Sequence, residues 1–252
     1  MITSSLFFPY ENTIRDVWSF LSYKLPEKYR TTCAQFLHDH NAKAATPLLN
    51  NTDPVAPVSF FVNDEYGGTV DRPRVDAMIK WFIKLKQDNF VIVPTIFCDN
   101  PWDENVVRFF DRHPSVFKMI CNALDPYVDG YIIGLESSEY LSAEQVNQAV
   151  ALMKQHTTHL VGTHMAWDYD DLSKLPSAIE FLAHEFPWDP HYGKDHSRAE
   201  VVEIAKKVIL KSQKRTWFLE DCYPSYDNVA IDHARGLAQI GIGGEGVPAP
   251  LN

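Results

Sequence analysis

Short runs of β-branched and aromatic residues alternate with longer segments of helical period along the chain, and this alternation constrains the fold more than any other feature. We count eight such runs: LFF near residue 7, VSFFV at 58–62, FVIVPTIF at 90–97, GYIIGL at 130–135, HLVGT at 159–163, IEFLA at 179–183, TWFL at 216–219 and QIGIG at 239–243. Repeated βα units of this kind are typical of a parallel sheet. The sequence therefore predicts an α/β fold.

The spacing of the runs favours one architecture within this class. Eight fairly even runs suit a closed (β/α)8 TIM barrel, and no run is followed by the glycine-rich loop of a nucleotide-binding open sheet. The alternative is an open, doubly wound sheet with helices on both faces. Because a barrel of about 250 residues is one unit, we predict a single domain over 1–252. Its last helix is expected to be incomplete, since the chain ends about ten residues after the eighth run.

Local patterns predict where three helices begin. Ser142 with Gln145, and Ser197 with Glu200, form capping boxes ahead of apolar stripes. Asp71 is a further predicted N-cap, with a proline shortly after it. The segment 41–57, NAKAATPLLNNTDPVAP, is expected to be a loop that joins the first helix to the second strand.

Composition excludes several classes of partner. The formal net charge of -10 at pH 7 disfavours nucleic acid and anionic lipid. No segment approaches the roughly 20 apolar residues of a membrane-spanning helix, and the N-terminus lacks the basic start of a signal peptide. The four cysteines have no metal-finger or CxxC spacing, so free thiols are expected. We therefore expect a soluble cytoplasmic protein.

Two glutamates stand out at the predicted strand ends, where parallel barrels carry their active sites. Glu136 follows the fourth run and Glu220 follows the seventh. Strands four and seven lie nearly opposite one another in a closed eight-stranded barrel, so the two carboxyl groups could flank one bond. Glycoside hydrolysis needs such a pair, one protonated to assist the leaving oxygen and one ionised to attack or to activate water.

On these two positions the sequence resembles the clan A glycoside hydrolases, the superfamily of cellulase-like (β/α)8 enzymes. The matching residues are Glu136 in YIIGLESSEY and Glu220 in TWFLEDCYP. The resemblance implies that Glu136 is the acid/base and Glu220 the nucleophile of a retaining mechanism, with no cofactor and no metal. The family usually has Asn before the acid/base, where this sequence has Leu135. A shifted register that uses Glu139 is therefore an alternative.

Further polar and aromatic residues after the runs are candidates for contacts with a carbohydrate substrate. Aromatic rings offer flat apolar faces that stack against sugar rings. Five such rings follow predicted strands: Trp102, Trp167, Trp188, Tyr223 and Tyr226. The predicted substrate-binding residues are Asn63, Asp64, Trp102, Glu139, His164, Trp167, His184, Glu185, Asp221, Tyr223 and Glu245.

Two other functions stay open on the same residues. Histidine and carboxylate groups together suit divalent ions, so the strand-end residues could instead be the ligands of a metal-dependent sugar isomerase-like barrel. Those residues are Glu136, His164, Glu185, Glu220 and Glu245. The third possibility is a barrel that binds carbohydrate without cleaving it. Removal of metal should abolish the activity of an isomerase-like barrel and spare that of a glycoside hydrolase. A barrel that only binds carbohydrate should show no turnover at all.

Overall fold

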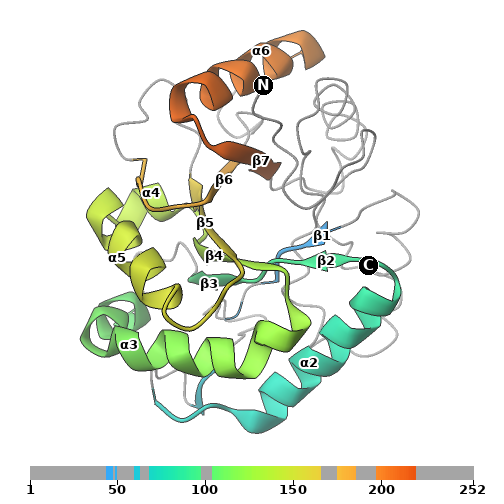
Figure 1. The fold of residues 1–252 in the computed structure, drawn as a ribbon, viewed down its shortest axis with the longest axis vertical. Helices are drawn as coiled ribbons and strands as arrows, with labels where there is room; N and C mark the ends of the chain where they lie inside the picture. Colours follow the sequence, from blue (N-terminus) through green and yellow to red (C-terminus); the bar gives the residue numbers. More distant parts are fainter. Residues whose placement is uncertain are drawn as a thin grey trace.

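A curved parallel sheet runs through the computed structural model, which describes residues 44–47, 49, 60–62, 68–97, 104–165, 175–185 and 197–219 (Figure 1). Its strands are β1 (Ala44–Ala45), β2 (Val91–Ile92), β3 (Thr95–Phe97), β4 (Gly130–Gly134), β5 (Leu160–Met165), β6 (Phe181–Glu185) and β7 (Arg215–Leu219). Every pair of neighbours is parallel and follows chain order, β1-β2 and then β3-β4-β5-β6-β7.

The break between β2 and β3 lies at Pro94, which has no N–H to donate to a ladder. Hydrogen bonds cross it on both sides. Thr95 N donates to Pro47 O at 2.9 Å, Leu49 N donates to Thr95 O at 2.8 Å, and Ile132 N donates to Pro94 O at 3.0 Å. The two small sheets are therefore one continuous wall.

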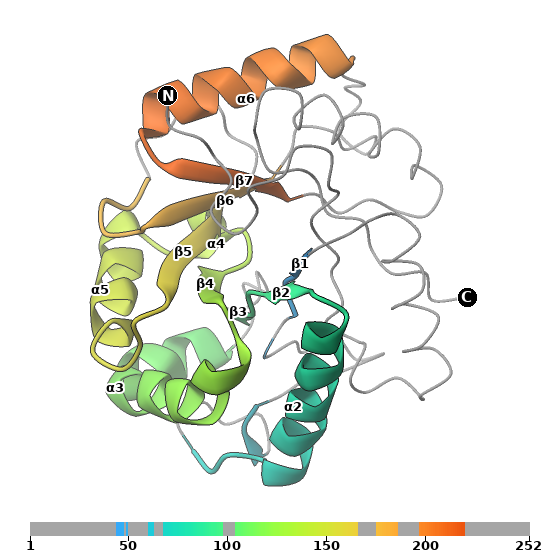
Figure 2. The same cartoon turned by 45° about the vertical axis from the view of Figure 1, so that its right-hand side comes forward.

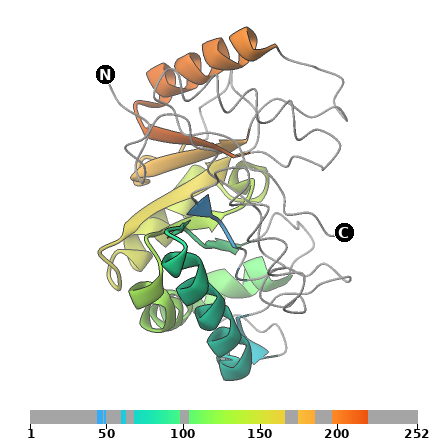
Figure 3. The same cartoon turned by 90° about the vertical axis from the view of Figure 1, so that its right-hand side faces the viewer.

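Four long helices cover one side of this wall: α2 (Arg72–Gln87), α3 (Glu104–Leu124), α5 (Ala143–Met153) and α6 (Arg198–Ser212). Figure 2 shows them in an arc outside the curved sheet, and Figure 3 shows α2 and α6 at opposite ends of it. A doubly wound sheet would carry helices on both faces. Over the part of the chain that the structure describes, the strands follow chain order and the long helices lie on one side, as in the wall of a β/α barrel, which agrees with the predicted α/β class.

The two faces of the sheet pack differently, because side chains alternate along a strand. Tyr131, Val161 and Leu182 belong to the hydrophobic core cluster that also contains helix residues. Phe181 and Ala183 are also fully buried but lie outside that cluster. They therefore occupy the inner face, which points away from the helices.

The predicted helix starts are confirmed. In α5 and α6 both halves of the capping box are present, at Ser142 with Gln145 and at Ser197 with Glu200. The side chain of Asp71 accepts from the backbone of the first turn of α2, and a proline occupies the start of that helix. These boundaries depend on contacts between residues three apart, which a sequence pattern specifies directly.

The prediction of the second strand is wrong. Residues 44–45, expected in a loop, form β1 and pair in parallel with β2. In the run VSFFV, Phe61 instead forms an isolated antiparallel bridge with Val70, and Phe60 and Phe61 are fully buried. These two phenylalanines therefore pack in the core without belonging to the parallel sheet. The first and eighth predicted strands lie outside the described residues.

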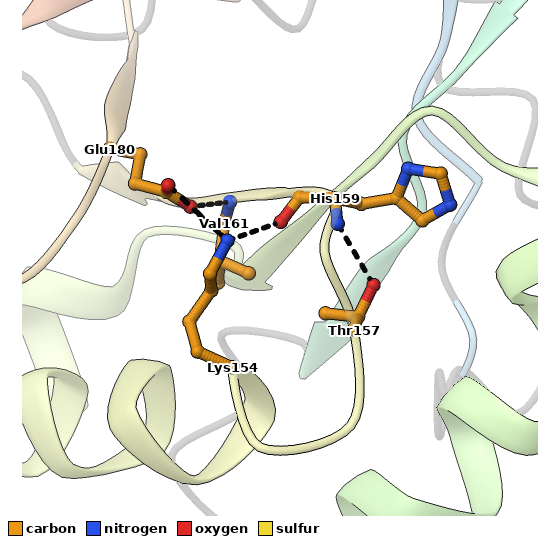
Figure 4. Close-up of polar contacts among 5 residues, drawn as sticks. All are labelled: Lys154, Thr157, His159, Val161 and Glu180. Carbon is orange, nitrogen blue, oxygen red and sulfur yellow. Dashed lines mark hydrogen bonds and ion pairs between the residues drawn. The ribbon is translucent and has the colours of Figure 1, made fainter.

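An ion pair with an added backbone contact joins β5 to β6 near the ends where these strands begin (Figure 4). Lys154 Nζ lies 3.0 Å from Glu180 Oε2 and also donates to His159 O at 2.9 Å. The same Glu180 oxygen accepts from Val161 N at 2.9 Å. Both charged side chains are about one-third exposed, so the ion pair alone contributes up to about 1 kcal/mol.

Replacing Glu180 tests the backbone contact. Glu180→Ala leaves the Val161 N–H without this acceptor and is expected to lower the free energy of unfolding by about 1–3 kcal/mol. Glu180→Gln keeps an amide oxygen for that N–H and loses only the charge, so it should cost less. Urea denaturation of both variants checks this expectation. Equal losses would mean that the contact with Val161 contributes nothing.

Candidate active site

Glu136 lies two residues after the end of β4 and is the N-cap residue of the short helix α4 (Ser137–Tyr140). Its backbone is left-handed, with φ 45° and ψ 38°. This conformation costs a residue with a Cβ roughly 1–2 kcal/mol. Among the described residues the other non-glycine positions with positive φ are Asn89 and Gln213, in the turns that follow α2 and α6. Strain of this kind collects at functional sites, which singles out Glu136.

His164 holds the backbone of Glu136. The N–H of Glu136 donates to Nδ1 of His164 at 2.9 Å, across 28 residues of sequence. Because Nδ1 accepts this bond it carries no proton, so the neutral imidazole has its hydrogen on Nε2. On its other polar group, Glu136 O accepts from Glu139 N at 2.9 Å. The residue is therefore fixed at both backbone polar atoms.

A second contact ties the start of α4 to β5. Ser137 Oγ donates to the backbone carbonyl of His164 at 2.8 Å and accepts from Thr163 Oγ1 at 2.7 Å. Ser137, Thr163 and His164 are each at most 1% exposed. Sequence reasoning did not identify Ser137 or Thr163 as part of the site. The only available signal was their position beside two candidate residues.

The described candidate residues do not all converge. His164 lies in register with Ala183, on the inner face of the sheet. His184 lies in register with Met165, which belongs to the core cluster against the helices, so it occupies the opposite face. His164 and His184, both predicted to contact the substrate, therefore lie on opposite faces of the sheet. Both residues, and Glu185, are inside β5 and β6 rather than after them.

Two more predicted positions can be located. Glu139 is exposed on α4, and Glu185 is the last residue of β6, paired in register with Leu219. The remaining predicted site residues lie outside the described residues: Asn63, Asp64, Trp102, Trp167, Glu220, Asp221, Tyr223 and Glu245.

The position before Glu136 has a structural role. Leu135 N donates to Phe97 O at 2.9 Å and so continues the pairing of β4 with β3. Its side chain is only 8% exposed. The place where the resembled family has Asn is thus filled by a buried apolar side chain.

The chemistry of His164 does not fit a metal ligand. A histidine binds a metal through a lone pair on one ring nitrogen. Here the Nδ1 lone pair accepts from the Glu136 N–H, and Nε2 carries the proton. Within the described part of the chain, no three His, Cys, Asp or Glu side chains gather closely enough to hold a metal ion.

The resolved pKa shifts lie near the opposite ends of the strands. Burial, together with the nearby Asp125 carboxylate, raises the pKa of the Cys121 thiol to about 12. Burial and then the hydrogen bond to Asp125, which Tyr131 donates at 2.6 Å, raise the pKa of Tyr131 well above its ordinary range. Both groups stay neutral, and both side chains belong to the hydrophobic core.

These raised values predict a loss of stability at alkaline pH. A group whose pKa is higher in the folded state contributes fully below its unfolded value, here 9.0 for Cys121 and 10.0 for Tyr131, and loses that contribution as the pH rises. The free energy of unfolding should therefore fall above pH 9.0. Tyr131→Phe, although less stable at neutral pH, should show a shallower fall in urea titrations at stepped pH. A fall as steep as in the wild type would contradict the assignment to Tyr131.

A pocket of about 510 Å³ also lies where strands begin, lined by Leu160, Ile179, Glu180, Gln213, Lys214 and Arg215. Lys214 Nζ donates there to Ser177 O and Ile179 O, both at 2.8 Å. Because parallel barrels carry their active sites at the other end of the strands, this pocket is not the candidate site.

Among the described helices, none is long and apolar enough to cross a membrane.

Several glycosidases are among the solved structures with a fold similar to this chain. A β-glucosidase from Thermotoga maritima has a TM-score of 0.64 at 10% identity, over 95% of this chain and 88% of that one. A GH113 β-mannanase from Alicyclobacillus acidocaldarius has a TM-score of 0.62 at 10% identity, over 97% and 88%. A β-glycosidase from Thermosphaera aggregans has a TM-score of 0.58 at 10% identity, over 96% and 88%.

Sequence comparison adds nothing to this: no protein-family model matches the chain, and no curated protein matches it. At about 10% identity the structural likeness shows the fold alone, and that fold is the TIM-barrel type. The described part of the chain has the parallel sheet and helices of the predicted α/β class, and its structural neighbours are TIM-barrel proteins.

Proposed function

We propose that the chain is a retaining glycoside hydrolase in which Glu136 is the acid/base and Glu220 the nucleophile. The observation that carries the proposal is the strained backbone of Glu136 at the end of β4, held by His164. A fold shared with a β-mannanase and a β-glucosidase supports it, with most of each chain covered. Their names suggest the substrate class, a β-linked glucoside or mannoside.

The proposed reaction has two steps. The carboxylate of Glu220 attacks the anomeric carbon while Glu136 gives its proton to the oxygen of the leaving group, and a covalent glycosyl-enzyme forms. Water then attacks the same carbon while Glu136 takes a proton from it, and the sugar leaves with its original configuration. This mechanism needs the two carboxyl groups about 5–5.5 Å apart.

The geometry of His164 favours this mechanism over the metal-dependent isomerase. With Nδ1 accepting from Glu136 and the proton on Nε2, the imidazole has no lone pair left for an ion. A metal ion bound by His164 would have to break that bond. The same bond is compatible with an acid/base glutamate, since it is donated by the backbone N–H of Glu136 and does not involve the carboxyl group.

Leu135 favours a second candidate, a barrel that binds carbohydrate without cleaving it. A buried leucine before Glu136 cannot donate to a sugar hydroxyl, and such contacts contribute to the transition state of glycosidases. Binding without turnover over long incubation would support this candidate.

The anomeric configuration of the first product tests the proposal. Proton NMR of a reaction on a β-glucoside or β-mannoside should show the β-anomer first, in the presence of a strong chelator. First release of the α-anomer would indicate inversion, for which a wider separation of about 6.5–9.5 Å is typical. Loss of turnover with the chelator, restored by a divalent metal, would show that the reaction depends on a metal and would contradict the proposed mechanism.

A further inference from the structure

His164 lies on β5 at a position where its side chain cannot reach solvent. It is 1% exposed and lies in register with Ala183 on the inner face of the sheet. Its neighbour Thr163 occupies the helix-facing side and contacts Ser137. The end of β5 therefore touches the start of α4 from both faces of the sheet.

The contact with Glu136 replaces a regular ladder bond. Leu135 N still pairs with β3, at Phe97 O. The next N–H along the chain, that of Glu136, points towards β5 and meets the imidazole rather than a backbone oxygen. The backbone carbonyl of His164 accepts from Ser137 Oγ instead. His164 of β5 thus accepts hydrogen bonds from two successive residues after β4, Glu136 and Ser137.

This arrangement has a consequence for the carboxyl group of Glu136. In a left-handed residue the Cβ leaves the backbone in a different direction from that in an extended strand. Without the hydrogen bond that it donates to His164, the backbone of Glu136 would relax towards a lower-energy conformation, and the carboxyl group would move with it. A displacement of about 1 Å at a catalytic group costs on the order of 100-fold in rate.

The geometry points to His164 as the positioning residue for the acid/base, a role that rests on the proposed function of Glu136. The imidazole acts as a hydrogen-bond acceptor at Nδ1 for the backbone and does not take part in proton transfer at that atom. Its protonated form has no lone pair at Nδ1 and would release Glu136.

Two substitutions separate this role from simple packing. In His164→Asn the amide oxygen can take the place of Nδ1, whereas in His164→Gln it reaches the place of Nε2. Positioning predicts that the value of kcat/KM for a β-linked oligosaccharide falls about 10- to 100-fold in the Gln variant and is largely retained in the Asn variant. Thermal denaturation of both variants checks that each is folded.

The leaving group supplies the decisive readout. A 2,4-dinitrophenyl glycoside needs no proton from the enzyme to depart, so its kcat/KM should change little in His164→Gln. A damaged fold would lower kcat/KM for both substrates together. An equal loss on both substrates, or an Asn variant as impaired as the Gln variant, would overturn the inference.

NMR of the wild-type protein tests the hydrogen bond between Glu136 and His164 and does not depend on an activity assay. The ¹⁵N chemical shifts of the His164 ring should show a protonated Nε2 and an unprotonated Nδ1, and the Glu136 amide resonance should move in His164→Gln. A proton on Nδ1 would overturn the inference. If the ring has the expected tautomer but the protein hydrolyses no glycoside, the proposed function is refuted. The hydrogen bond would then exist without a role in catalysis.

Discussion

Replacing Glu136 with Gln is expected to lower kcat/KM for a β-linked oligosaccharide by about 10²- to 10⁴-fold, the usual contribution of a general acid. Gln has the size and shape of the glutamic acid but no proton to give to the leaving oxygen. For a 2,4-dinitrophenyl glycoside, kcat/KM should stay near the wild-type value, because that leaving group departs without protonation. Its kcat should still fall, since the second step needs Glu136 as a base.

Two further variants complete this experiment. Glu203 is an exposed residue of α6, so Glu203→Gln serves as the control for removing one carboxyl group far from the site. Glu139→Gln tests the shifted register. If that variant, rather than Glu136→Gln, showed the dependence on leaving group, the acid/base would be Glu139 and the assignment to Glu136 would be wrong.

Replacing Phe181 with Ala is expected to lower the free energy of unfolding by about 3–5 kcal/mol, as large-to-small changes at buried aromatic residues do. Phe181 is fully buried on the inner face of the sheet. A Cβ built at Gly162, on the neighbouring strand, would lie 2.6 Å from the Phe181 ring and 2.5 Å from its backbone oxygen. The ring thus fills the space that the absent side chain of Gly162 leaves.

The control for this prediction is Leu210→Ala. Leu210 is 72% exposed on α6 and should change stability by less than about 0.5 kcal/mol. Midpoints and slopes of urea denaturation measure both effects. A loss under about 1 kcal/mol at Phe181 would mean that the inner face is not packed as a barrel core is.

Features set by near neighbours in the sequence could be predicted. The capping boxes at Ser142 and Ser197 involve residues three apart, and both helices begin where the pattern places them. The run GYIIGL likewise matches β4, because its residues are buried on both faces as a parallel strand requires. Such signals are local, so no knowledge of the tertiary structure is needed.

Features that depend on distant contacts could not be predicted. β1 consists of two alanines, which carry no β signal, and it is specified by its pairing with β2. The run at 58–62 has the composition of a strand because Phe60 and Phe61 are buried in the core. Hydrophobic composition reports burial, and burial alone does not distinguish a strand of the sheet from a packed loop.

The same division holds at the candidate site. The rule that chemistry follows the ends of parallel strands was enough to select Glu136. It could not reveal that His164 binds the backbone of Glu136, because that contact needs a left-handed residue which no local pattern indicates. It also selected both His164 and His184 as substrate-binding residues, because the ends of the fifth and sixth strands were predicted two residues too early.

Trapping the covalent glycosyl-enzyme tests whether the protein is a retaining glycoside hydrolase with Glu220 as its nucleophile. A 2-deoxy-2-fluoro-β-glycoside with a dinitrophenyl leaving group forms the covalent intermediate quickly and releases it slowly, so the adduct can be weighed and mapped. A retaining mechanism with Glu220 as its nucleophile predicts a mass increase of one fluoroglycosyl unit, located on the peptide that contains Glu220. A protein that hydrolyses β-glycosides but carries the label on another residue, or releases product of inverted configuration without any adduct, would contradict it.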